Sequence, residues 1–259
     1  MSFDIARPNM RANLTKVWMF SKPIIALLLI WEIVVQLNLV PPQMLPHVSD
    51  VVLTFSAMIS SGALAEPTYL TLMRAILALI LSVSLGVTIG LLMARFKIVE
   101  WFFDPIISIG FPIPKVTLVP IYLLWFGFGT RSAVLLAATS AIFPVIIATH
   151  NGAKSVDREL IWSVRTMGVS KLESMWKVIL PAALPQIFNG IQIAVFLSFV
   201  VVVVAEMVTS GSGLGQVLVQ STQFFNTEQA LVVLITIISL GLVTNAVFQI
   251  LRSYLLRWT

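Results

Sequence analysis

Of the charged side chains that lie inside long apolar stretches, three are best placed to do chemistry or to form a buried pair. Lys115, halfway along one stretch, could attract an anion. Glu206, near the end of another, could form a gating ion pair with Lys115, Arg74 or Arg131. Glu32 is more typical of a structural carboxylate that pairs with a neighbour. Charges are costly in lipid and therefore mark functional candidates; structural ion pairs, a snorkelling lysine and a solvated outer carboxylate are the alternatives.

Other chemistry-bearing residues are scarce. The chain has no cysteine and two histidines, His47 and His150, which fall outside the apolar stretches and on opposite sides of the expected membrane. We expect both to be solvated loop residues, so neither a metal site nor an intramembrane protease is predicted. The sequence GSGLG at 211–215 lacks a preceding strand and a Walker lysine, and it is predicted to be a flexible outer turn. No catalytic residue, cofactor or metal is expected in this chain.

The composition is that of an integral membrane protein. Hydrophobic residues make up 58% of the 259 residues and charged residues 10%, with a mean hydropathy of +0.99. A soluble domain carries about 25% charged residues. The net charge of +5 comes from short scattered loops and not from a basic patch, so the expected partner is a lipid bilayer and no nucleic acid.

Six apolar runs are long enough to cross a bilayer as helices. The first ends in LVPPQ without a signal-peptide cleavage site, so we expect it to remain as a span. The six runs extend approximately over Ile24–Val40, Leu70–Ala94, Phe102–Phe126, Ala133–Thr149, Ile187–Val208 and Ala230–Leu251.

The basic residues predict the orientation of these spans. All but three of the 16 lysines and arginines fall before span one, between spans two and three, between spans four and five, or after span six. The exceptions are Arg74, Lys115 and Arg131. Because positive loops stay in the cytoplasm, both termini are predicted to be inside. We expect a cytoplasmic segment at 1–23 and one all-α membrane domain at 24–259.

The third run contains four prolines, which kink or break helices. Broken backbone is tolerated in a membrane only inside protein or beside a water-filled cavity. Pro112, Pro114 and Lys115 are therefore predicted to line a pathway, with a proline-kinked packing helix as the alternative.

A charged loop separates spans four and five. Its apolar residues recur at helical spacing in two sets, around Gly168, which suits the end of a helix. Ser170 and Glu173 fit a capping box that would start the second helix. The pattern predicts two short helices in a compact knob, and an amphipathic loop lying on lipid is an equal alternative. The two sets are Leu160, Ile161, Val164 and Met167, then Leu172, Met175, Trp176 and Ile179.

Residues 159–185 resemble the cytoplasmic loop of permeases of binding-protein-dependent ABC importers. That family has Glu-Ala-Ala, three residues, Gly, nine residues, and Ile-x-Leu-Pro. Gly168 and the run 178–181 fit, whereas Trp162, Ser163 and Val164 stand at the Glu-Ala-Ala positions, so the family's glutamate is absent. The resemblance implies a coupling loop at about 150–181 with ATPase-contacting residues Trp162, Ser163, Val164, Met167, Gly168, Val169, Ser170, Leu172, Leu180 and Pro181.

Further segments are similar to the nitrate/sulfonate/taurine branch of that family. They are Trp31-Glu32 with the following LVPPQMLPHVSDV, the third-span sequence FPIPKVTLVPIYLLWFGFGTRS, and VVAEMVTSGSGLG at 203–215. The stretch IFPVIIATHNG at 142–152 also fits, with Ala148 where asparagine is usual. Their order along the chain matches that of the family.

This resemblance implies the type I ABC importer permease fold, with a coupling helix between spans four and five. It further implies a homodimer, or a pair with a second permease, in a bacterial inner membrane. Two copies of a separate ATPase would bind ATP and Mg and do the hydrolysis, so this chain would not be an enzyme. A periplasmic or lipid-anchored binding protein would deliver the substrate.

The substrate is expected to be a small anion such as a sulfonate, nitrate or another oxyanion. A nitrogen-heterocycle vitamin precursor remains an alternative, because the binding protein largely decides substrate choice in such importers. A secondary transporter driven by an ion gradient is a second alternative. It would usually show inverted repeats and intramembrane relays, and we find no internal repeat in this sequence.

Overall fold

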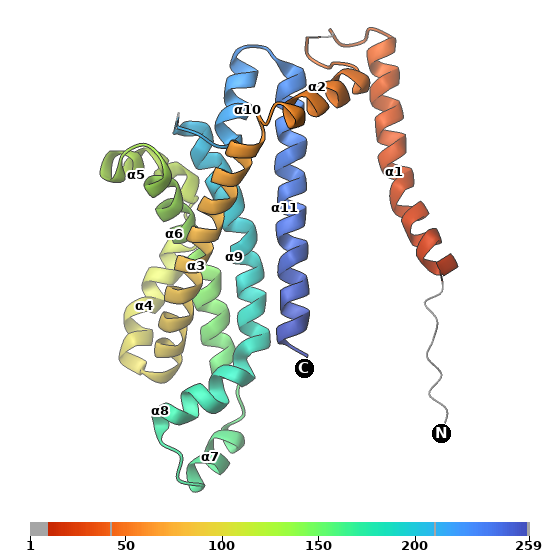
Figure 1. Ribbon diagram of the computed structural model, residues 1–259. Coiled ribbons are helices and arrows are strands. Elements are labelled where there is room, and N and C mark those ends of the chain that lie inside the picture. The colour runs from red at the N-terminus through yellow and green to blue at the C-terminus, as the bar shows by residue number, and fades with distance from the viewer. Residues whose placement is uncertain (1–9, 42, 210, 258–259) are drawn as a thin grey trace.

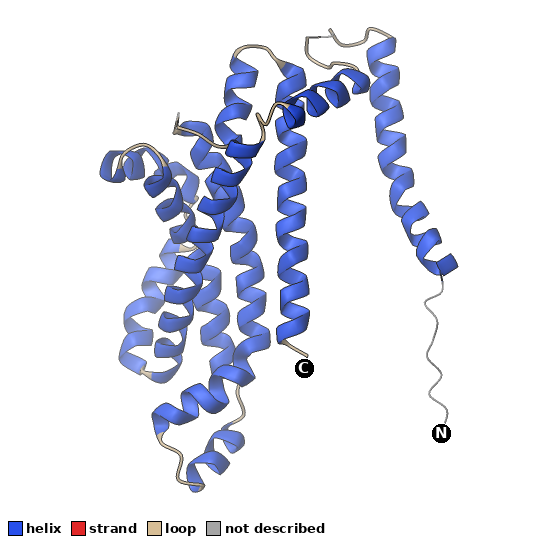
Figure 2. Cartoon of the chain, viewed as in Figure 1, coloured by secondary structure: helices blue, strands red, loops and turns tan. Residues whose placement is uncertain are grey.

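The computed structural model describes the backbone of residues 10–41, 43–209 and 211–257, and there the chain is helical without a strand (Figures 1 and 2). The side chains of 10–21, 158, 161, 165, 171 and 172 lie outside the description. The helices are α1 (Met10–Gln36), α2 (Val48–Ser60), α3 (Ala65–Arg95), α4 (Lys97–Gly110), the 3-10 turn η1 (Lys115–Leu118), α5 (Val119–Phe126), α6 (Thr130–Lys154), α7 (Arg158–Thr166), α8 (Lys171–Ser174), the π-helical turn η2 (Met175–Ile179), α9 (Leu180–Val208), α10 (Leu214–Gln223) and α11 (Thr227–Leu255).

Four described helical segments are long and apolar enough to cross a membrane: α3, α6, η2 joined to α9, and α11. A fifth span is formed if α4 and residues 115–126 are taken together, although they are bent by 92°. The predicted third span is thus broken at its prolines. α1 has 27 residues and ends at Gln36, four residues before the predicted end of span one. The described residues thus give four or five candidate spans, and the number six stays a prediction.

The centre of the fold is the packing of α3, α6 and α9, which lie side by side in Figure 1. Small residues let these backbones approach closely, as is usual where helices pack in lipid. A Cβ on Gly90 of α3 would lie 2.6 Å from Cβ of Thr149, and one on Gly190 of α9 would lie 2.4 Å from Cβ of Ala148. α6 contributes several fully buried alanines to this core, including Ala133, Ala137 and Ala141.

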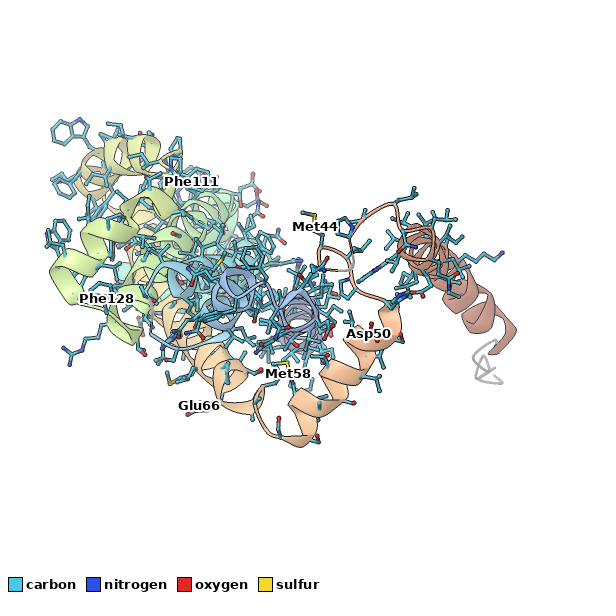
Figure 3. All side chains as sticks on the ribbon, turned by 90° about the horizontal axis from the view of Figure 1, so that it is seen from above. Met44, Asp50, Met58, Glu66, Phe111 and Phe128 are labelled. Atoms are coloured by element: carbon cyan, nitrogen blue, oxygen red, sulfur yellow. The ribbon has the colours of Figure 1, made fainter. Side chains whose placement is uncertain are left out.

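α1 stands apart from the central bundle and connects to it through α2 (Figure 1). Seen from above, Phe111 and Phe128 lie on the far side of the bundle from α1 (Figure 3). The joint between α1 and α2 is polar: Trp31 Nε1 donates to Pro46 O at 3.0 Å, and Glu32 accepts from Val48 N at 3.2 Å. Glu32 also lies 2.9 Å from Nδ1 of His47. The structural role predicted for Glu32 is consistent with these bonds.

His47 is a partly exposed loop residue, as the sequence predicted, but His150 is not. His47 precedes α2, whose first backbone N–H groups need acceptors, and Glu32 serves both that helix and the imidazole. His150 lies within α6 because this helix runs to Lys154, five residues past the predicted end of span four. Its Nε2 is 3.5 Å from Glu100 of α4, and the side chain is 13% exposed.

Candidate functional site

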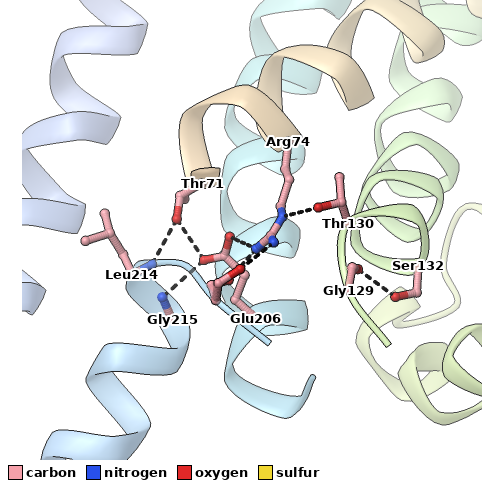
Figure 4. A network of polar contacts seen from close by, with 9 residues as sticks. Thr71, Arg74, Gly129, Thr130, Ser132, Glu206, Leu214 and Gly215 are labelled. Carbon is pink, nitrogen blue, oxygen red and sulfur yellow. Dashed lines mark hydrogen bonds and ion pairs between the residues drawn. The ribbon is translucent and has the colours of Figure 1, made fainter. Parts of the chain in front are cut away.

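A buried ion pair joins α3 to α9 near one end of the bundle (Figure 4). Nη1 of Arg74 donates to Oε1 of Glu206 at 2.7 Å, and the two side chains are 4% and 0% exposed. Of the three cations proposed as partners of Glu206, the structure therefore selects Arg74. Arg131 is exposed at the start of α6, and no contact among the described residues joins Lys115 to Glu206.

The second oxygen of the Glu206 carboxylate holds the start of α10. Oε2 accepts from Thr71 Oγ1 at 2.8 Å and from Gly215 N at 3.1 Å, while Thr71 Oγ1 accepts from Leu214 N at 3.0 Å. Leu214 and Gly215 are the first two residues of α10. A carboxylate is stabilised at this position because a helix N-terminus presents free N–H groups and partial positive charge.

The guanidinium of Arg74 extends the network to two further segments. Nε donates to Thr130 Oγ1 of α6 at 3.1 Å, and Nη2 donates to Ser212 Oγ at 3.0 Å. Nη1 also donates to the backbone oxygen of Ser212. Arg74 therefore ties α3, α6, α9 and the turn before α10 into one block.

The glycine-rich turn is packed tightly against this network. Gly213 has φ +120°, and a Cβ there would lie 2.2 Å from Cδ of Glu206. A Cβ on Gly215 would lie 2.2 Å from the backbone oxygen of Val203. These two glycines therefore serve close packing around a buried carboxylate, in addition to the turn that the sequence predicted.

Sequence reasoning named Arg74 and Glu206 but missed Thr71, Thr130, Ser212 and Gly213. One signal was available: Thr71 and Arg74 are three residues apart within one helix, so they share a face. The contribution of the backbone oxygen of Ser212 could not be inferred, because a backbone group carries no residue-type signal.

Lys115 lies in the break of the third span, at the first position of η1. Its ammonium donates to backbone oxygens of Gly110, Phe111 and Ile113. Pro112 and Pro114 are exposed in the same break, as expected for residues that interrupt a helix.

The loop between α6 and α9 contains the predicted knob, at the opposite end of the molecule from α10 (Figure 1). α7 ends at Thr166, and Gly168 takes φ +83°, the left-handed geometry of a helix terminus. Ser170 and Glu173 form the reciprocal bonds of a capping box: Ser170 N donates to Glu173 Oε2 at 3.1 Å, and Glu173 N donates to Ser170 Oγ at 3.3 Å. The backbone N–H of Ser170, its hydroxyl and Lys177 lower the pKa of Glu173 below its usual 4.5.

Large apolar side chains are exposed on this knob. Trp162 is 63% exposed and Met167 81% exposed, and Ser163, Gly168 and Ser170 also lie at the surface. Val164 and Val169 are half-buried, and the side chain of Leu172 lies outside the description. Exposed apolar groups at the tip of a polar loop are typical of an interaction surface.

The end of the loop is joined to the bundle. Leu180 packs on a buried cluster that contains Met175, Leu91 of α3, Ala153 of α6 and Ile187 of α9. Pro181 is exposed in the first turn of α9, where proline is compatible with a helix. Of the ten predicted coupling residues, Leu180 therefore connects the loop to the core, whereas Trp162, Ser163, Met167, Gly168 and Ser170 form the exposed tip of the loop.

Comparison with known proteins gives consistent matches. The family described as "Binding-protein-dependent transport system inner membrane component" matches residues 86–259. The chain is 35% identical to the putative aliphatic sulfonates transport permease protein SsuC of Bacillus subtilis (strain 168), over 88% of this chain and 83% of that protein. It is 30% identical to the taurine transport system permease protein TauC of Escherichia coli (strain K12), over 90% and 86%.

Solved structures show the same fold. An inward-facing structure of the MetNI methionine ABC transporter superposes with a TM-score of 0.66 at 19% identity, covering 74% of this chain and 95% of the other. A crystal structure of an amino acid ABC transporter with histidines gives a TM-score of 0.62 at 20% identity, covering 79% and 98%.

Proposed function

This chain belongs to the family of binding-protein-dependent transport system inner membrane components and is the permease component of an ABC importer, and we propose that it forms the pathway for a small sulfonate or related anion. ATP hydrolysis in such importers belongs to a separate subunit. The observation that carries the substrate proposal is the 35% identity, over most of both chains, to a permease named for aliphatic sulfonates.

The proposed topology has six spans with both ends of the chain in the cytoplasm. Its support is the charge distribution together with the shape of the fold. The start of α1, the end of α11 and the knob of α7 and α8 all lie toward one side of the molecule (Figure 1). Most basic residues also belong to that side, which is the cytoplasmic side by the positive-inside rule.

The knob is the proposed contact with the ATPase. Trp162 and Met167 are large, exposed and apolar, and residues of this kind anchor interfaces when they enter a pocket on a partner. Trp162 replaces the family's glutamate, so the contact at this position would rest on apolar burial and not on a salt bridge. Gly168 permits the sharp turn between the two short helices.

Coupling then requires that movement of the knob reach the pathway. At the inner end, Leu180 and Met175 connect the knob to α3, α6 and α9. At the outer end, the Arg74–Glu206 network ties the same three helices together. Helices fixed to one another at both ends move as one body, so closure of the ATPase dimer would rock this block between inward-open and outward-open states.

The proposed assembly contains two copies of this chain, two ATPase subunits and one binding protein, in a bacterial inner membrane. ATP and Mg would bind only to the ATPase. Native mass spectrometry of the complex, gently solubilised from its own host, tests this composition. A particle with two copies of this chain and two of an ATPase supports the proposal, whereas a second kind of permease would replace the homodimer.

The substrate is tested by uptake into proteoliposomes that contain this chain, its ATPase and its binding protein. We expect ATP-dependent uptake of labelled taurine or a short alkanesulfonate, inhibited by an excess of unlabelled sulfonate and not by a neutral heterocycle. Competition by a heterocyclic vitamin precursor alone would instead assign the alternative substrate class. Uptake abolished by a protonophore at constant ATP would favour a gradient-driven transporter.

A further inference from the structure

The break in the third span leaves backbone oxygens without their helical partners. In a continuous helix, the oxygen of Gly110 would accept from the N–H of residue 114, and that of Ser108 from residue 112. Both residues are prolines, which carry no N–H. The chain then turns by 92° between α4 and the segment 115–126. Unpaired carbonyls at such a break cost several kcal/mol each in a bilayer, roughly, unless another donor reaches them.

The ammonium of Lys115 is that donor. It donates to the oxygens of Gly110, of Phe111 at 3.3 Å and of Ile113 at 2.8 Å. One of the three is the oxygen of Gly110, which has lost its helical partner because residue 114 is a proline. This oxygen also accepts from Ile113 N at 3.3 Å. A positive charge at this point also complements the partial negative charge at the C-terminus of α4.

A buried aromatic ring fixes the ammonium from its other side. Nζ of Lys115 lies 4.7 Å from the ring centroid of Phe143, within the range of a cation–π contact. Phe143 belongs to α6 and packs in a cluster with Ile107 of α4. A Cβ on Gly110 would lie 2.9 Å from Cζ of that ring, so the glycine lets the ring approach the break. Lys115 thereby connects the break to the central bundle.

We propose that Lys115 is a positioning residue that closes the end of α4 with its own ammonium and sets the bend of the broken span. An ammonium has three N–H donors, and three backbone oxygens take them. In this conformation, no donor is left over to bind an anion. The positive charge in the middle of the span is thus bound by backbone oxygens of the same chain, and the predicted attraction of an anionic substrate is not its primary role. What this means for transport rests on the proposed function of the chain as a pathway, whereas the bonds of Lys115 to the break do not depend on that function.

The bend can be measured with two spin labels, because the chain has no native cysteine. Ile98 in α4 and Leu124 in α5 are each 83% exposed and suit replacement by cysteine. Rises of 1.5 Å per α-helical and 2.0 Å per 3-10 residue give arms of about 18 Å and 15 Å. Counting these two arms alone, without residues 111–114, the positions are about 23 Å apart at the observed bend and about 33 Å apart if the arms were collinear. The labelled chain, mixed with excess unlabelled chain, is measured within the full transporter by double electron–electron resonance.

Lys115→Met removes all three donors and keeps an unbranched side chain that is only one atom shorter. We expect its distance distribution to shift toward longer values and to broaden. Lys115→Arg, which can still donate to carbonyls, should stay near the wild-type distance. The matched control is Lys97→Met, which removes an exposed lysine from the first position of α4 and should leave the distribution unchanged. A distribution for Lys115→Met that matches the wild type would overturn the proposal, and a raised KM for sulfonate uptake at unchanged distance would assign Lys115 to the substrate.

A second variant covers the case in which Lys115→Met does not accumulate. Pro114→Ala restores the N–H that can bond to Gly110, so the double variant Pro114→Ala/Lys115→Met should recover membrane yield while keeping the longer distance. Failure of the double variant to recover yield would contradict the proposed loss of carbonyl partners. Since neither distance nor yield depends on uptake, these outcomes are separate from the test of the importer's substrate.

Discussion

The Arg74–Glu206 pair offers a quantitative test of the network that joins α3, α6 and α9 near α10. Replacing Arg74 by Met leaves a carboxylate that is 0% exposed without its countercharge. Removing one partner of a buried ion pair costs about 3–5 kcal/mol. For a chain of this size, each kcal/mol lowers the melting midpoint by about 2–4 °C, so the variant should melt about 6–20 °C lower.

A double-mutant cycle separates the pair from the loss of either side chain. Glu206→Gln keeps the size of the group and can still accept from Gly215 N, but it removes the charge. In the double variant Arg74→Met/Glu206→Gln no unpaired charge remains. We therefore expect it to be more stable than the sum of the single variants predicts, by about 1–3 kcal/mol.

The assay is the apparent midpoint of thermal unfolding in one detergent at one scan rate, followed by gel filtration of the heated protein. A fixed scan rate is needed because such unfolding is usually irreversible. Arg131→Met is the matched control, since this arginine is exposed and its loss should cost within about 0.5 kcal/mol. Additive single variants, or an Arg74→Met variant as stable as the control, would refute the conclusion that the buried pair stabilises the packing of α3 against α9.

Three further predictions concern the glycines and the knob. Gly213→Ala should lower the melting midpoint more than Gly62→Ala. Both glycines have positive φ, but only Gly213 would place a Cβ against Glu206. Equal shifts of the midpoint would mean that only the backbone strain of a positive φ matters and that the contact with Glu206 does not. Gly168→Asp should keep the chain folded and ATP hydrolysis active but reduce uptake, since open space surrounds Gly168, and unimpaired uptake would remove its coupling role. The pKa of Glu173 is lower in the folded protein than its ordinary value of 4.5. The charged capping box therefore stabilises the knob fully at pH values above 4.5, and this stabilisation is lost as the pH falls through the lowered pKa. Hydrogen exchange at 170–174 should rise there in the wild type, and a Glu173→Gln variant with the same pH profile would contradict this.

The long apolar runs were sufficient to predict most of the membrane helices. Spans four and six lie within α6 and α11, because a run of about 20 apolar residues has few alternatives in lipid. α2 was not predicted, because its 13 residues are too few to cross a bilayer. α10 was missed for a similar reason, because it begins inside a glycine-rich turn.

The partners within the site were harder to predict than the helices. The sequence marked Glu206 as a charge in an apolar stretch with three possible partners, and Arg74, the one it bonds to, is 132 residues away. Only the packing of α3 against α9 decides between them. Lys115 shows the same limit: its type and position indicate a costly charge, but the direction of its ammonium, back toward three carbonyls, follows from the three-dimensional course of the break.

The central claim is that ATP hydrolysis in a partner subunit drives solute through this chain, and reconstituted transport tests it most directly. Proteoliposomes should contain this chain, its ATPase and its binding protein, with ionophores added to abolish every ion gradient. We expect accumulation of labelled sulfonate only with ATP present on the side of the knob, and loss of accumulation in the Gly168→Asp variant. Accumulation that needs an ion gradient, or that continues without ATP, would contradict the account.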